Sequence, residues 1–196
     1  MRKRYEAVLP PGYTAVYTVD ATRKKTAVLL NLAGAGIMVL SMLIGYLLIQ
    51  PHNFLGEFSF LRSILVPVFI VVYLFLHELL HGLAYKVLTR KKLSFGLTLS
   101  VAFCGVPNIY VYRSTALPAL LLPFLVFLPI FLLPAVFCSD PWDQMCGLLL
   151  LSLHLGGCCG DLYDTALFLF RFKDSQTLML DTGPQQTFYC RIISAD

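Results

Sequence analysis

The sequence predicts an all-α membrane protein, with four transmembrane helices and a small β-hairpin in the cytoplasmic loop between helices 2 and 3. Two observations support this fold class. Of the 196 residues, 58% are hydrophobic and only 13% are charged, a composition typical of membrane proteins rather than of soluble domains. Four apolar stretches are also long enough to cross a bilayer, which takes about 20 helical residues. We therefore expect residues 1–196 to form a single polytopic membrane domain.

The apolar stretches predict where the four spans lie. We expect them at residues 27–49, 60–87, 115–137 and 146–170. The third span contains four prolines, Pro118, Pro123, Pro129 and Pro134. Proline removes a backbone donor from a helix and kinks it. This span is therefore either a hinged gate for water or substrate, or a bent packing helix.

The basic residues predict the orientation of the chain. Lysines and arginines lie before the first span, between the second and third spans, and after the fourth span, whereas the loops "QPHNFLGEF" and "SDPWDQ" contain none. Cytoplasmic loops are enriched in lysine and arginine. We therefore expect a multi-pass protein of the cell membrane whose two termini and central loop are cytoplasmic.

An alternating pattern in the central loop predicts the hairpin, over about residues 93–112. From Leu93 to Phe103, apolar residues alternate with small or polar ones, which is the period of a strand with one apolar face. The segment "CGVPN" then turns the chain, and "IYVY" returns as a second strand. An edge of the hairpin either takes up an extended substrate by strand addition or only caps the helices. The candidate substrate-binding residues are Phe95, Leu97, Leu99 and Asn108, with turn formation as the alternative role of Asn108.

The segment "HELLH", inside the second apolar stretch, contains His77, Glu78 and His81. Residues four apart in a helix differ by about 40° in direction and about 6 Å in height, so both imidazoles can reach one metal ion. This is the HExxH arrangement, in which two histidines bind zinc and the glutamate is the general base for a metal-activated water. The alternative is three inert polar residues that face a neighbouring helix. Ionisable groups inside a membrane helix, however, usually mark function.

A catalytic zinc site needs a third protein ligand, and the other spans offer His154, Asp161 and Asp164. Asp161 precedes the basic Arg171 by 10 residues, and the two histidines precede Arg90 by 13 and 9, so all three lie at a similar depth. We therefore expect Asp161 as the third ligand, with a helix–helix hydrogen bond as its alternative role. Asp164 is an alternative ligand or a group that orients a histidine. His154 lies roughly 10 Å from Asp161 along the helix axis, which favours a structural role or hydrogen bonding to the transition state.

The combination of "HELLH" in a transmembrane helix and a later "GD" segment resembles the site-2-protease class of intramembrane zinc metalloproteases. The chain is still more similar to a family of small bacterial membrane proteins of unknown function, the "putative zincin peptidases". This similarity runs from "LPPGY" through "HELLHGLAY" and "LSFG" to "GDLYD". It implies cleavage of peptide bonds within or beside the membrane, with Glu78 as base and with His77, His81 and Asp161 as ligands. The "GD" segment lacks the asparagine, the proline and the following glycine of better-known site-2 proteases.

The tail contains a further motif, the triplet "DTG" that begins at Asp181 and is familiar from aspartic proteases. It occurs once in the chain, whereas an aspartic protease needs two such carboxylates. We therefore interpret it as part of a short hairpin that turns at "TGPQQ".

The sequence thus predicts an intramembrane zinc-dependent hydrolase, and most specifically a metalloprotease. The alternative is a non-catalytic metal-binding membrane protein, such as a transporter, a sensor or a pseudoprotease that binds transmembrane segments. The expected cofactor is Zn²⁺, and the expected partners are membrane lipid and a peptide or transmembrane-segment substrate. We expect no nucleic-acid partner, because no basic folded module displays the positive charge. The oligomeric state is left open.

Overall fold

The computed structural model describes residues 3–51, 60–97 and 102–192. Within these residues the helices are α1 (Lys24–Ile49), α2 (Phe60–Thr89), α3 (Arg113–Phe137), α4 (Pro141–Gly157), α5 (Cys159–Ala166) and the π-helix η1 (Leu167–Arg171). The strands are β1 (Tyr5–Glu6), β2 (Tyr13–Asp20), β3 (Ser94–Leu97), β4 (Ala102–Gly105), β5 (Tyr110–Tyr112), β6 (Leu178–Asp181) and β7 (Gln185–Arg191).

Three of the helices are long and apolar enough to cross a membrane by themselves: α1, α3 and the part of α2 from Arg62 onward. The fourth predicted span is broken. Helix α4 and the segment from Cys159 to Arg171 meet the same criteria only as a pair, with a bend of 43° between them. Glycines at 156, 157 and 160 lie around this break, and glycine lowers helix propensity. The described residues therefore contain three candidate spans, or four if the bent pair is one span, which fits a membrane protein.

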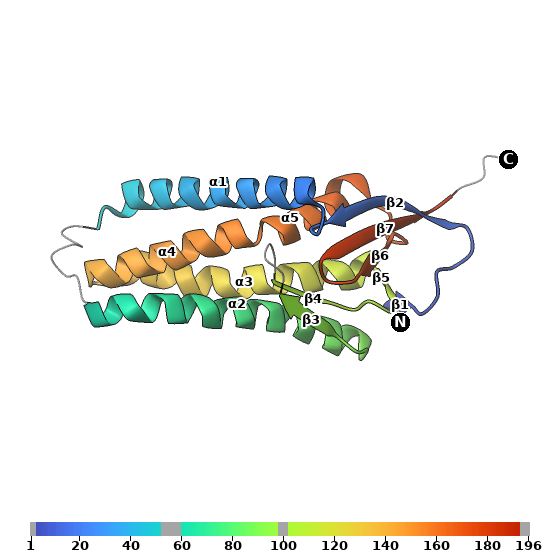
Figure 1. Cartoon of the computed structure of the whole chain (residues 1–196), viewed down its shortest axis with the longest axis horizontal. Helices are drawn as coiled ribbons and strands as arrows, with labels where there is room; N and C mark the ends of the chain where they lie inside the picture. The colour runs from blue at the N-terminus through green and yellow to red at the C-terminus, as the bar shows by residue number, and fades with distance from the viewer. Residues whose placement is uncertain (1–2, 52–59, 98–101, 193–196) are drawn as a thin grey trace. The chain divides into compact units, whose positions relative to one another are not determined.

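The strands form two antiparallel sheets. The larger sheet has five strands in the order β1-β5-β6-β7-β2, and the smaller sheet pairs β3 with β4. In the larger sheet, β2 from the start of the chain lies beside β7 from its end, with Tyr13 opposite Arg191 and Asp20 opposite Gln185 (Figure 1). The prediction of an all-α fold with one hairpin is therefore wrong. The reason is that the sheet joins segments from both ends and the middle of the chain, and the two ends look like polar extensions when each is considered alone.

The predicted central hairpin is only partly correct. Strands β3 and β4 pair with Ser94 opposite Gly105. Strand β3 lies inside the stretch that was expected to be one strand, whereas β4 begins in that stretch and continues into the expected turn. The segment expected as the returning strand, "IYVY", instead contributes β5, which pairs with β1 and β6. Alternation has the same period in both arms of a hairpin, so it does not reveal where a strand is interrupted. The hairpin expected in the tail is confirmed, because β6 and β7 pair with Asp181 opposite Gln186.

The chain divides into two compact units. The first consists of Met1–Leu29, His77–Pro123 and Asp161–Asp196, and the second of Leu30–Leu76 and Phe124–Gly160. In the first unit, the larger sheet buries an apolar core. Its fully buried side chains include Val106, Val111, Leu178, Met179 and Phe188. The side chain of Arg4 also donates a hydrogen bond to the carbonyl of Leu88 at the end of α2.

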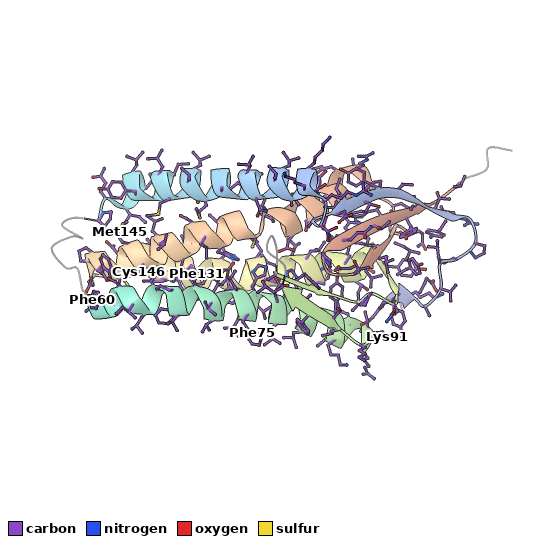
Figure 2. All side chains as sticks on the ribbon, viewed as in Figure 1. Phe60, Phe75, Lys91, Phe131, Met145 and Cys146 are labelled. Carbon is purple, nitrogen blue, oxygen red and sulfur yellow. The ribbon has the colours of Figure 1, made fainter. Side chains whose placement is uncertain are left out.

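The second unit contains the apolar lengths of the helices. Its interior holds an aromatic cluster in which the Tyr73 ring makes edge contacts with Phe127, at 5.0 Å between centroids, and with Phe131. Helices α1 and α4 approach closely where Gly34 meets Gly156, since a Cβ at Gly34 would lie 2.7 Å from the Gly156 carbonyl oxygen. Small residues allow such contacts between membrane helices. Apolar side chains such as Phe75 project from the outer face of α2 and are exposed (Figure 2).

Candidate metal centre

Three of the predicted ligands converge in the first unit. His77 and His81 project from one face of α2, and Asp161 projects from the first turn of α5. Both histidines are buried, and the Asp161 side chain is 21% exposed. The i, i+4 spacing in α2 places the two rings on the same side, with their centroids 5.0 Å apart.

The three potential ligand atoms form an equilateral triangle. Nε2 of His77 lies 3.3 Å from Nε2 of His81, and each of these nitrogens lies 3.3 Å from Oδ2 of Asp161. A direct hydrogen bond between a charged nitrogen and a carboxylate is shorter, about 2.7–2.9 Å. Two nitrogens and a carboxylate oxygen that point toward one place form an arrangement that a cation stabilises.

The dimensions of this triangle fit zinc. A tetrahedral zinc ion binds nitrogen and oxygen at about 2.0–2.1 Å, which keeps its ligand atoms roughly 3.3–3.4 Å apart. Two histidines and a carboxylate also form a known ligand set of catalytic zinc, with the fourth position left for water or substrate. The residues present therefore match the metal in chemistry and in spacing.

A hydrogen bond holds the ring of His81 in this orientation. Its Nδ1 lies 2.8 Å from the backbone carbonyl oxygen of Ala119 in α3. A carbonyl oxygen only accepts hydrogen bonds, so Nδ1 is the donor. In the neutral ring, Nε2 then keeps its lone pair and can bind a metal.

Glu78 lies beside the triangle. One ligand atom from each of His77, Glu78 and His81 lies within 4.8 Å of the others, and Glu78 is partly buried. A carboxylate at this position can take a proton from a molecule held between the histidines.

The two alternative ligands lie in different surroundings. Asp164, one turn after Asp161, is 4% exposed, and its Oδ1 has no hydrogen-bond partner within the described residues. His154 lies in the second unit, where Nδ1 is 2.9 Å from the Tyr73 hydroxyl and Nε2 is 3.2 Å from the Phe124 carbonyl oxygen. Both ring nitrogens of His154 thus have partners in its own unit.

The predicted substrate-binding residues lie on the smaller sheet and the turn after it. Phe95 and Leu97 are exposed on β3, Asn108 is exposed in the turn before β5, and Leu99 lies outside the described residues. Strand β3 runs against α2, because a Cβ at Gly82 would lie 2.6 Å from Cζ of Phe95. Gly82, which directly follows the second histidine, therefore allows this strand to approach α2. No pattern in the sequence indicates that role of Gly82.

Asp181, from the "DTG" triplet, joins the tail to α2. Its Oδ2 accepts a 2.6 Å hydrogen bond from the hydroxyl of Tyr85, one turn after His81, and its Oδ1 accepts one from the Gly183 amide. The Asp181 carbonyl also accepts a hydrogen bond from the Val106 amide. Burial raises the pKa of Asp181 to about 6, against the lowering effect of these hydrogen bonds. The one sequence feature that could have indicated this contact is Tyr85, because it follows the second histidine at helical spacing.

Cys104 lies at the end of β4, near this carboxyl group. Burial, together with the negative charge of Asp181, raises the pKa of the Cys104 thiol to about 12. Only a thiolate is a strong metal ligand or nucleophile. Cys104 is therefore neither at neutral pH.

Comparison with protein families connects this geometry to a known group. The family model described as "Putative zincin peptidase" matches residues 69–176, more than half of the chain. The matched segment contains Glu78 and the three converging side chains, and it ends before Asp181. No curated protein and no solved structure matches the chain.

Proposed function

The chain belongs to the family described as "Putative zincin peptidase", and from this premise we propose that it is an intramembrane zinc-dependent metallopeptidase. Its zinc would be held by His77, His81 and Asp161. The observation that supports this best is the triangle of their ligand atoms, with all three edges at 3.3 Å. Oδ2 of Asp161 lies 3.3 Å from Nε2 of each histidine, so we favour Asp161 over Asp164 as the third ligand.

The helices support the intramembrane setting. Both histidines lie in α2, which meets the criteria for a membrane span, and Asp161 lies in the bent pair that meets them together. Ionisable groups in such helices are costly unless they bind an ion or serve catalysis. We retain the predicted orientation, with both termini and the β3–β4 sheet on the cytoplasmic side, because the basic residues flank these segments. Membrane lipid is then the protein's main partner.

The reaction follows from the positions of the side chains. Zinc, when bound, supplies Lewis-acid chemistry that acidifies water and polarises a peptide carbonyl. Glu78 accepts the proton of the attacking water and later returns it to the departing amine nitrogen. The hydrogen bond between His81 and the Ala119 carbonyl keeps the ring of one ligand oriented throughout the reaction.

The substrate is a peptide in an extended conformation. Strand β3 pairs only with β4 among the described strands, so its other edge has main-chain groups available for hydrogen bonding. The exposed side chains of Phe95 and Leu97 provide an apolar surface for the peptide's side chains. A helical segment has its carbonyls in internal hydrogen bonds, so it must unwind before it can bind there.

The test is the Glu78→Gln variant, expressed beside the wild type in the same cells. Glutamine keeps the size of the side chain but cannot accept the proton. We expect it to abolish the peptide termini that the wild type generates in membrane proteins, measured by terminus-enrichment mass spectrometry. Zinc content per purified chain should stay unchanged, because the three ligands remain. Glu6→Gln, the same substitution on β1, is the control and should behave as the wild type.

Two results would contradict the proposal. Identical peptide termini in the wild type and in Glu78→Gln would leave a non-catalytic metal-binding protein as the better account. Loss of zinc in Glu78→Gln would show that Glu78 is a ligand rather than the base.

A further inference from the structure

The hydrogen bond between His81 and α3 uses a backbone carbonyl that would already accept an internal hydrogen bond in a regular helix. Ala119 lies inside α3 and is fully buried. In an α-helix, each carbonyl accepts the amide hydrogen of the residue four positions later. The Ala119 carbonyl is nevertheless the group that receives the Nδ1 hydrogen of His81, at 2.8 Å.

The residue four positions after Ala119 is Pro123. Proline has no amide hydrogen, and its ring pushes against the carbonyl four residues earlier, which turns that carbonyl away from the helix axis. The Ala119 carbonyl therefore has no partner at residue 123. Pro123 is itself fully buried in the first unit, which also contains both residues of the hydrogen bond.

We propose that Pro123 is a positioning residue of the metal centre. By removing one amide from α3, it leaves the Ala119 carbonyl to accept the hydrogen of His81. That bond fixes the tautomer and the rotation of the ring, so that Nε2 faces His77 and Asp161 at 3.3 Å. This inference rests on the proposed zinc site, and it explains why a residue that disfavours helices occupies the interior of an apolar one.

In energetic terms, α3 loses one internal hydrogen bond at Ala119, and the hydrogen bond from His81 replaces it. Prolines are tolerated in membrane helices when a neighbouring group satisfies the carbonyl they free. Here the neighbouring group is the proposed metal ligand His81, so the carbonyl that α3 leaves free orients a side chain of the site. An ordinary residue at position 123 would restore the internal hydrogen bond of the helix, and the restored amide would turn the carbonyl back toward the helix axis and share it with His81.

The experiment compares Pro123→Ala and Pro123→Val with the wild type. Alanine restores the amide, and valine restores it while keeping a side chain of similar size. Zinc affinity is measured in mild detergent by competition with a chromophoric chelator, and thermal stability is measured on the metal-free protein. We expect both variants to bind zinc about 10- to 100-fold more weakly, as is usual when the partner of a ligand histidine is lost. Their thermal midpoints should not fall, because the regular helix is restored.

Pro129→Ala is the matched control. Pro129 lies in the same helix but on an exposed position, and it is not part of the metal centre. This change should raise thermal stability without altering zinc affinity. If the effect came only from a stiffer helix, Pro129→Ala would weaken zinc binding in the same way as the two Pro123 variants.

The outcomes separate this inference from the proposed function. Unchanged zinc affinity in both Pro123 variants would refute the role of Pro123 while leaving the zinc site intact. Weaker binding in Pro123→Ala but not in Pro123→Val would also refute it, because packing of the ring would then be the cause. A wild-type protein that binds no zinc would refute the metal centre itself, and this inference with it.

Discussion

Replacing Asp181 by asparagine should change how the stability of the protein depends on pH. Asp181 is 3% exposed, and burial raises its pKa from 3.8 to about 6. At 1.36 kcal/mol per pKa unit, this difference corresponds to about 3 kcal/mol between the charged and neutral forms. Asparagine has nearly the same shape and does not titrate, so the comparison isolates this carboxyl group.

The sign follows from proton linkage. The folded state holds the proton of Asp181 more tightly than the unfolded chain does. The contribution of Asp181 to the free energy of unfolding is therefore largest below about pH 4 and is lost as the pH rises through about 6. Relative to Asp181→Asn, the wild type should gain about 2–3 kcal/mol when the pH falls from 7 to 4, because the full difference is reached only below the unfolded pKa. For a chain of this size, that gain corresponds to about 5–10 °C in the thermal midpoint.

The assay is thermal unfolding of metal-free protein in mild detergent between pH 4 and pH 7. Other carboxyl groups titrate equally in both proteins and cancel in the difference. Asp174→Asn, at an exposed position in the tail, is the control and should follow the wild type. A difference between wild type and Asp181→Asn that stays constant with pH, or grows as the pH rises, would refute the reasoning.

Two glycine substitutions test other contacts around the site. Gly105→Ala should lower the free energy of unfolding by about 1–3 kcal/mol, because the new Cβ would lie 2.4 Å from the backbone nitrogen of Gly183. Gly36→Ala, where no atom lies within 4 Å, is its control and should not destabilise the protein in the same thermal assay. Gly82→Ala should leave zinc content unchanged but reduce peptide cleavage, since the new Cβ displaces the ring of Phe95, part of the apolar surface proposed for the substrate. Equal cleavage by Gly82→Ala and wild type would argue against β3 as the substrate strand.

The helices were predictable because they depend on local properties of the sequence. A run of apolar residues fixes a span within a few positions, as in α2, which was expected at residues 60–87 and ends at Thr89. The break near Cys158 was missed, since mean hydropathy does not register a run of glycines. The relative position of His77 and His81 could also be predicted from local sequence, because residues at i and i+4 share one helix face.

The five-stranded sheet was not predictable in the same way. Strand β2 does alternate, with Tyr13, Ala15, Tyr17 and Val19 two residues apart. Its partner, β7, lies at the other end of the chain, and alternation alone does not identify a partner. No local pattern therefore indicated that the two terminal segments pair with each other, and their pairing became visible only in the structure.

The surroundings of the metal centre were the least visible part of the site. The depth argument selected Asp161, which the structure brings to both histidines. The acceptor for His81 is the backbone carbonyl of Ala119, and residue types do not reveal which backbone groups are free. The only indication in the sequence is Pro123, four residues after Ala119. The tie between Tyr85 and Asp181 joins positions 96 residues apart, and no local pattern connects them.

The most direct test of the central claim is the metal content of the purified protein, measured by mass spectrometry for the wild type and three variants. We expect roughly one zinc per chain in the wild type and in Asp164→Ala, and its loss in His81→Ala and Asp161→Ala. Well-folded wild-type protein without zinc, or zinc retained in Asp161→Ala and lost in Asp164→Ala, would contradict the account.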